Sequence, residues 1–216
     1  IKSTDFMQNF TYLKFKKYNF FIVTIILLIT GFIKAQTRTI QPGSVIINMG
    51  VTPQTFSNGL KPYGLVYNLL DIQKVPVIWS INPTKVKDGI DFSVDGIDFR
   101  GGTFVIEKQY AVISNVQAAI ASFVSQGVVV HTTTSPVSIP LYKELMAFPK
   151  WVMDFDNGNI AIAYLTNAGI PSTAYRKALP TDLNNCDDLF ILPHADPTWV
   201  THGLPLLTWN GPISNG

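Results

Sequence analysis

The segment Thr103–Thr132, TFVIEKQYAVISNVQAAIASFVSQGVVVHT, decides the fold class. It begins with a short apolar run (Thr103–Glu107) and ends with another (Val128–Thr132). Between them, in Tyr110–Gln126, apolar residues recur every three or four positions, which predicts an amphipathic helix. Gly127 is typical of a helix C-terminus. Two short apolar runs joined by a helix predict a β–α–β unit with parallel strands.

The same alternation extends towards the N-terminus. Ser44–Asn48 and Val75–Ile81 are apolar, β-branched runs that we predict to be strands. Leu60–Gln73 lies between them and has the apolar spacing of a helix. A β-hairpin insertion is predicted near 91–99, because Asp95-Gly96 supplies the positive φ angles of a two-residue turn.

A second series of strands and helices begins near Lys150. It comprises strands at Trp151–Phe155, Thr173–Lys177 and Leu189–Leu192, and helices at Asn159–Ala168 and Trp199–Trp209. Short apolar strands without strict two-residue alternation indicate a sheet buried on both faces. We therefore predict an α/β fold of three layers, a mostly parallel sheet with helices on both faces. The expected units are 36–149 and 150–216, and the second is expected to be incomplete because it ends in a helix rather than a further strand.

Residues 1–35 have the pattern of a secretory signal peptide. A lysine-rich segment at 14–17 precedes an apolar run at 20–33, and Ala35 supplies a small residue for cleavage. The apolar run is shorter than the roughly 20 residues that a membrane-spanning helix needs. We predict a cleaved leader, with 1–6 upstream of its native start, and a product that is secreted or held at the cell surface. An uncleaved membrane anchor is the alternative.

Removing the leader changes the charge of the chain. The chain has 16 basic and 14 acidic side chains, and residues 1–35 contain five of the basic and one of the acidic ones. The remainder therefore has 11 basic and 13 acidic side chains, a net charge of −2. No basic run remains, so we expect no nucleic-acid partner. Membrane contact is expected only through the leader before cleavage. The glycines at 101–102 match no nucleotide-binding motif, and no cofactor is expected.

Polar residues at the ends of predicted strands are the candidate site. Ligands of open α/β sheets bind outside the carboxyl ends of the strands. The residues expected to line such a crevice are His131, Asp154, Asp156, His194 and Asp196.

A zinc site could be formed by His194, Asp196 and His202, because imidazole and carboxylate are ordinary zinc ligands. Their spacing matches no metal motif, and no metal is expected. The alternative is that Asp196 caps the following helix while His194 binds backbone.

Two further motifs suggest chemistry but have simpler interpretations. Asp154–Gly158 (DFDNG) departs from the calcium loop of EF-hands, so a turn and a helix start explain it better. Ser135 and His131 could form a nucleophile and base, but no Gly-x-Ser-x-Gly elbow exists in the chain. The single cysteine, Cys186, lies among carboxylates and is expected to be structural, with an intermolecular bridge as the alternative.

Several segments carry a family resemblance. NIAIAYLTNAGIP (Asn159–Pro171) and CDDLFILPHADPTW (Cys186–Trp199) are similar to the opening of a class I glutamine amidotransferase-like, flavodoxin-like domain. VPVIWSINPTKVKDGIDF (Val75–Phe92) and FRGGTFVIE (Phe99–Glu107) resemble N-terminal regions of large secreted or cell-surface proteins of gliding-type bacteria. The amidotransferase nucleophile is a Cys on an elbow after the next strand. Cys186 does not match that position, so no catalytic residue carries over, and a shared fold does not imply the activity.

These observations favour a binding or scaffolding role over catalysis. The chain is expected to be an exported N-terminal α/β domain of a larger extracellular or cell-surface protein. Its partner would be an extracellular ligand or the remaining domains of the same chain. One alternative is a fragment of a secreted hydrolase or amidotransferase-like enzyme whose nucleophile lies beyond residue 216. Another is a metal-dependent enzyme that acts on carbohydrate or peptide.

Overall fold

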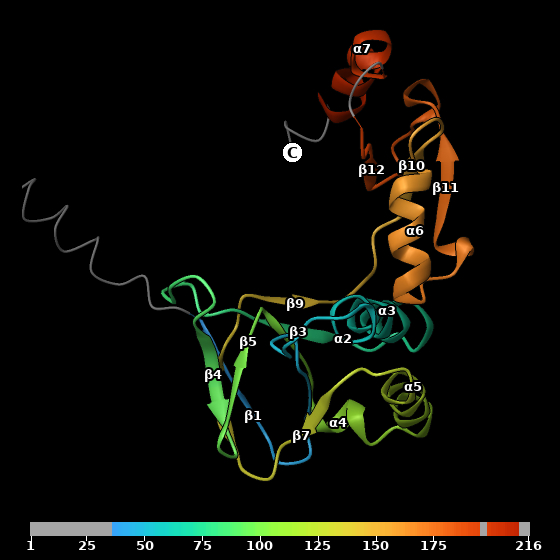
Figure 1. Ribbon diagram of the computed structural model, residues 1–216. Helices are drawn as coiled ribbons and strands as arrows, with labels where there is room; N and C mark the ends of the chain where they lie inside the picture. Colours follow the sequence, from blue (N-terminus) through green and yellow to red (C-terminus); the bar gives the residue numbers. More distant parts are fainter. Residues whose placement is uncertain (1–35, 195–197, 212–216) are drawn as a thin grey trace, which may run out of the picture. The chain divides into compact units, whose positions relative to one another are not determined.

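The computed structural model describes residues 36–194 and 198–211 (Figure 1). The chain divides between Ala35 and Gln36, and the description concerns the part from Gln36 onward. The predicted leader and Asp196 lie outside the described residues. None of the helices in the described ranges has the length and apolar character needed to span a membrane.

A five-stranded antiparallel sheet organises the chain before residue 150. Its strands are β2 (Val45–Ile47), β3 (Val77–Ser80), β6 (Thr103–Ile106), β7 (Val130–Thr132) and β9 (Lys143–Leu145). They lie in the order β7-β2-β6-β3-β9, and every neighbouring pair is antiparallel.

Two helical crossovers are interleaved in this sheet. The first joins β2 to β3 through α2 (Phe56–Gly59), α3 (Lys61–Tyr67) and the π-helical turn η1 (Asn68–Ile72), and the second joins β6 to β7 through α4 (Lys108–Ala111) and α5 (Ser114–Ser125). Each crossover joins strands that point the same way, but an antiparallel strand lies between them: β6 in the first case and β2 in the second. This β–α–β–β–α–β connectivity is the split βαβ, or ferredoxin-like, arrangement.

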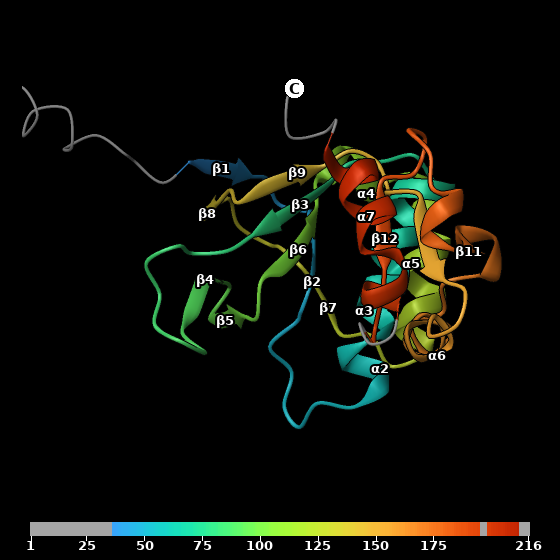
Figure 2. The same ribbon diagram turned by 90° about the horizontal axis from the view of Figure 1, so that it is seen from above.

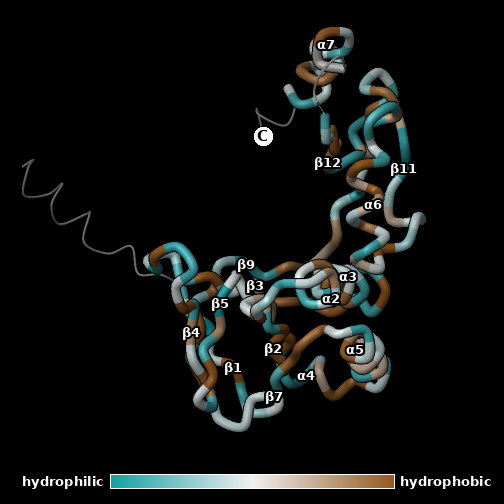
Figure 3. The backbone as a smooth tube through the Cα atoms, viewed as in Figure 1, coloured by the Kyte–Doolittle hydropathy of each residue, from teal (hydrophilic) through white to brown (hydrophobic). Residues whose placement is uncertain are grey.

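In the part of the chain that the structure describes, helices cover only one face of the sheet. Val45 and Ile47 of β2 point into a core with Leu65 and Leu69 from the first crossover and Ile120 of α5. Figure 3 shows the hydropathy of these elements along the backbone, with hydrophobic positions in β2 and α5. Because successive residues of a strand face opposite sides, Ile46 points the other way.

Antiparallel strands cover the opposite face. They are the hairpin of β4 (Ile90–Val94) and β5 (Ile97–Arg100), and the pair of β1 (Thr37–Ile40) with β8 (Val137–Pro140). Ile46 and Ile78 of the sheet pack there against Phe92, Phe99 and Ile139. Figure 2 shows the hairpin and the helices on opposite sides of the sheet.

The predicted three-layer, mostly parallel sheet with helices on both faces is therefore wrong. The central strands β2, β6 and β3 are buried on both faces, as their unbroken apolar runs indicated, but the β4-β5 hairpin and the β1-β8 pair rather than helices cover the second face. The β–α–β pattern along the chain was real, yet its strands are not neighbours in the sheet.

A small parallel sheet follows residue 150. Its strands are β10 (Trp151–Asp154), β11 (Tyr175–Ala178) and β12 (Leu189–Ile191), in the order β11-β10-β12. They are connected by α6 (Asn159–Ala168) and by the short 3₁₀ turns η2 (Ser172–Ala174) and η3 (Pro180–Asp182), and α7 (Thr198–Asn210) follows β12. Among the described residues, this is the one sheet with parallel pairing.

A small apolar cluster joins the parallel sheet to the first crossover. Buried Tyr67 packs with Ala168 at the end of α6, and Phe148 lies between Tyr67 and Trp151. The ring centroids of Phe148 are 4.7 Å from Tyr67 and 4.4 Å from Trp151, both edge to face. This cluster is called the aromatic joint below.

Candidate functional site

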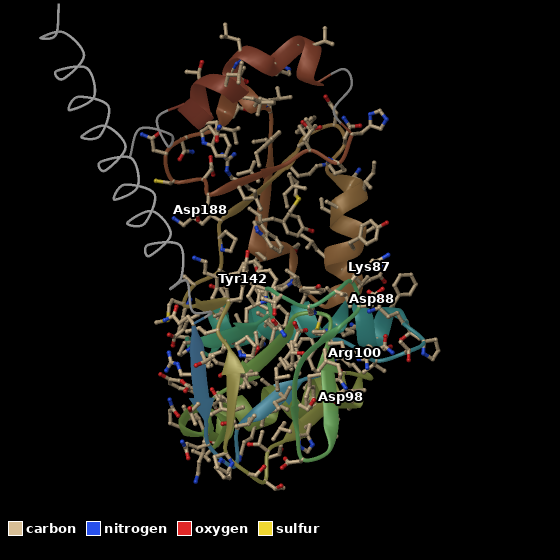
Figure 4. The ribbon with its side chains drawn as sticks, turned by 90° about the vertical axis from the view of Figure 1, so that its left-hand side faces the viewer. Lys87, Asp88, Asp98, Arg100, Tyr142 and Asp188 are labelled. Carbon is tan, nitrogen blue, oxygen red and sulfur yellow. The ribbon has the colours of Figure 1, made fainter. Side chains whose placement is uncertain are left out.

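The carboxyl edge of the parallel sheet has the geometry of a ligand site. β10 is the central strand: the chain leaves it through α6 to reach β11 on one side, and later returns to β12 on the other. The strand order therefore reverses between β10 and β12, and ligands of open α/β sheets bind at the carboxyl ends of the strands at such a point. Asp188 (labelled in Figure 4) marks the opposite, amino edge, where its carboxylate accepts a hydrogen bond from the Lys150 backbone (2.7 Å).

Asp154 is the residue that the fold places at this edge. It ends β10 and is completely buried. Its Oδ2 accepts hydrogen bonds from the Asn157 backbone N–H (2.8 Å) and from Asn157 Nδ2 (3.2 Å). Its Oδ1 is buried and has no hydrogen-bond partner among the described residues. One oxygen of a buried carboxylate thus lacks a partner in the part of the chain that the structure describes, immediately before the N-terminus of α6.

The turn from β10 into α6 is tight because Gly158 has no side chain. Gly158 N–H donates to the Asp154 carbonyl oxygen (2.8 Å). A Cβ at position 158 would lie only 2.7 Å from Met153 Cβ, which places α6 against the Met153 face of β10. Strand alternation then puts the Asp154 side chain on the other face.

The other buried carboxylates have complete sets of partners. Asp91 accepts from Lys85 Nζ (2.7 Å) and from the backbone N–H groups of Asn82 and Gly102 (2.8 and 3.0 Å). Asp187 accepts two hydrogen bonds from the Arg176 guanidinium (2.6 and 3.2 Å) and one from the Asn184 backbone (2.9 Å). These contacts bind surface loops to the sheets.

The contacts of Asp187 also set its ionisation. Burial opposes ionisation of this carboxyl, but the hydrogen bonds from Arg176 and Asn184 outweigh it and hold the pKa of Asp187 below its ordinary value. Asp187 therefore stays charged because it is paired.

No basic side chain of the described residues forms an ion pair with Asp154. Lys177 pairs in register with Met153, so it lies on the α6 face, where its Nζ is 3.1 Å from Asn159 Oδ1 and 5.6 Å from the ring centroid of Phe155. Arg176 is on the Asp154 face but binds Asp187. Burying a carboxylate without a partner costs free energy, so we expect a further group to interact with Asp154.

The remaining predicted site residues have different surroundings. Asp156 is exposed in the turn before α6, and His194 is exposed beyond the end of β12 at the same edge. His202 is partly buried in α7. In the described ranges, no three or more His, Cys, Asp or Glu side chains form a group suited to a metal, so His194 and His202 are not brought into one there.

His131 belongs to another part of the fold. It lies on β7 of the antiparallel sheet, where its Nε2 is 2.8 Å from Asp95 Oδ2. Asp95 also accepts hydrogen bonds from the backbone N–H and Oγ1 of Thr134 (2.8 and 2.7 Å) and from Ser135 Oγ (2.7 Å). Since Ser135 and His131 both bind Asp95, the geometry is that of a clamp and not of a nucleophile with its base. This group of four residues is called the Asp95 clamp below.

The Asp95 clamp was missed at the sequence level. Asp95-Gly96 was interpreted only as turn chemistry, and its partners lie 36 to 40 residues later. The hydrogen bonds from the Thr134 backbone, His131, Ser135 and the Thr134 hydroxyl hold the pKa of Asp95 well below its ordinary value. The clamp fastens the hairpin turn to the segment that follows β7.

Comparison with known proteins adds no assignment: no family model, no curated protein and no solved structure matches this chain.

Proposed function

We propose that this chain is an exported α/β domain of a larger extracellular or cell-surface protein, and that it binds a ligand at the carboxyl edge of the β11-β10-β12 sheet. The observation that supports binding is the buried, unpaired Oδ1 of Asp154. The leader pattern at 1–35 and the net charge of −2 after it support export without a nucleic-acid partner.

The energetics of burial favour a ligand at Asp154. A buried acceptor without a partner costs about 1–3 kcal/mol, and more when it is charged. Asp91 and Asp187 avoid this cost through Lys85 and Arg176. Among the described residues, Asp154 has only Asn157 as a partner, so a bound group that donates a hydrogen bond or carries positive charge would recover the cost.

Export is tested by the mass of the product. The chain is expressed with its leader in a bacterium, and the extracellular and surface fractions are analysed by intact mass spectrometry. We expect a product that begins at Gln36. A product that keeps 1–35, or that stays inside the cell, would contradict export.

Binding is tested by comparing native and denaturing mass spectra of the exported protein, purified without chelator. We expect a mass difference in the native protein that is lost on denaturation and is absent from Asp154→Asn. Asp88→Asn is the matched control, because Asp88 is an exposed carboxylate elsewhere in the fold (Figure 4). Equal native and denatured masses, or the same adduct on Asp154→Asn, would contradict binding at this edge.

A further inference from the structure

The chemistry around Asp154 narrows the class of ligand. The atom without a partner, Oδ1, is a buried carboxylate oxygen, which accepts and does not donate hydrogen bonds when ionised. The basic side chains on the neighbouring strand, Arg176 and Lys177, are bound to Asp187 and to Asn159. The missing partner must therefore bring a proton donor or a positive charge from outside the described residues.

A second carboxylate in the same turn favours positive charge. Asp156 follows two residues after Asp154, is exposed, and has no basic partner among the described residues. Asp156 adds a second negative charge two residues from Asp154. A cation at the turn would be attracted by both carboxylates, whereas a neutral ligand would interact with Asp154 Oδ1 alone.

We propose that Asp154 Oδ1 and Asp156 bind a divalent, oxygen-preferring cation of the magnesium type at the turn between β10 and α6. The proposal rests on the proposed binding function of this edge and names its ligand. Mg²⁺ is commonly held by one or two carboxylates and several waters, so it does not need a cluster of three acidic or imidazole side chains. Ca²⁺, which takes six to eight oxygen ligands, fits two carboxylates less well.

The N-terminus of α6 is compatible with this arrangement. Asp154 Oδ2 already accepts the Asn157 N–H, so one carboxylate oxygen satisfies the helix start and the other is left for the cation. The N-terminus of a helix alone would favour binding of an anion. Here the Asp154 carboxylate already occupies that position, so a further ligand is expected to be a cation.

The test is thermal unfolding of the exported, mature protein, first treated with chelator and then titrated with MgCl₂ or CaCl₂. We expect Mg²⁺ to raise Tm by roughly 5 °C or more at saturation, with calorimetry giving one ion per chain. Asp154→Asn should remove this shift, and Asp156→Asn should reduce it at least several-fold. Asp88→Asn should behave as the unaltered protein.

The metal-free proteins give a second readout. Without Mg²⁺, Asp154→Asn should be at least as stable as the unaltered protein, because the amide removes an uncompensated buried charge. If Asp154→Asn does not fold, the proposal is tested by the Mg²⁺-induced Tm shift of Asp156→Asn, because Asp156 is exposed. An unchanged Tm with both ions, or an equal shift in Asp156→Asn, would overturn the cation proposal. If the native adduct is then organic, ligand binding at this edge stands and only the cation is wrong.

Discussion

The Asp95 clamp shows how one carboxylate can position a hairpin. Asp95 has a left-handed backbone (φ 52°), which Asn also adopts readily. Asp95→Asn should therefore keep the turn but replace one carboxylate oxygen with an NH₂ group, which cannot accept the hydrogen bonds that this oxygen receives in the clamp. We expect Tm to fall by a few degrees at neutral pH, measured by circular dichroism. Asp88→Asn, also at positive φ (60°), is the control and should change Tm little.

The effect of Asp95 should depend on pH. Its folded pKa lies below the value of about 3.9 expected in an unfolded chain. The stabilisation is therefore fully present above about pH 4 and is lost as the pH falls further towards the folded pKa. The Tm difference between Asp95→Asn and the unaltered protein should shrink below about pH 4. A constant difference down to pH 2 would contradict the role of the charged form.

Tyr67 has the opposite pH signature. Burial, and then the hydrogen bond that Tyr67 donates to Asp71 (2.7 Å), raise the pKa of Tyr67 to about 12. A raised folded pKa stabilises the fold below the unfolded pKa of about 10, and this contribution is lost as the pH rises through the folded pKa. Urea unfolding between pH 9 and 11 should show a steeper loss of stability for the unaltered protein than for Tyr67→Phe. Parallel pH profiles would refute this assignment.

Residue patterns in the sequence singled out Asp154 but not the interactions of Asp95 or Tyr67. Asp154 follows from a local rule, since it ends an apolar strand that precedes a helix. Asp95 and Tyr67 owe their shifted pKa values to different causes. Tyr67 donates a hydrogen bond to a residue four positions away, but its pKa is raised mainly by burial. The pKa of Asp95 is lowered by residues at the end of β7 and just after it, which the fold brings close. Neither burial of an individual polar atom nor a distant partner is visible in residue spacing.

At the scale of elements, helix α3 approaches its neighbours through Gly64. A Cβ there would collide with the carbonyl oxygen of Ala168 in α6 and would lie 3.0 Å from Phe123 Cε1 in α5. Gly→Ala ordinarily stabilises a helix by about 1 kcal/mol. At Gly64 we expect the reverse, a loss of about 1–3 kcal/mol in the free energy of unfolding, because the helices must move apart.

The matched control for this contact is Gly59→Ala in α2. The nearest atom to a Cβ at Gly59 is Gln54 Oε1, 3.9 Å away, so the substitution should be neutral or stabilising. Urea unfolding of both variants measures the difference. Equal stabilities for the two variants would show that α3 does not depend on close packing at Gly64.

Element positions were more predictable than strand directions. The helix expected at Tyr110–Gln126 is present as α4 and α5, and the hairpin turn at Asp95-Gly96 joins β4 to β5. Spacing of apolar residues encodes which side of an element is buried, and turn residues encode local backbone angles. Neither apolar spacing nor turn residues indicate which strands are neighbours in a sheet. The insertion of β2 between β6 and β7 therefore could not be predicted from Thr103–Thr132.

At the scale of the chain from Gln36 onward, we expect the aromatic joint to couple the unfolding of the antiparallel and parallel sheets. Phe148 is the central ring, in contact with Tyr67 of α3 and Trp151 of β10. Edge-to-face pairs of this kind contribute about 0.5–1.5 kcal/mol each beyond their buried area. Phe148→Ala should therefore weaken the coupling more than it weakens either sheet.

Hydrogen exchange with mass spectrometry at increasing urea measures this coupling. In the unaltered protein, we expect 151–191 and 103–132 to lose protection at the same urea concentration. In Phe148→Ala, 151–191 should lose protection first, while 103–132 keeps its original midpoint. Phe56→Ala is the control, because Phe56 is an exposed ring of α2 (67 % exposed) outside the joint. If the two segments already separate in the unaltered protein, the joint holds the sheets in contact without making their unfolding cooperative. The carboxyl edge of the parallel sheet would then unfold independently of the antiparallel sheet.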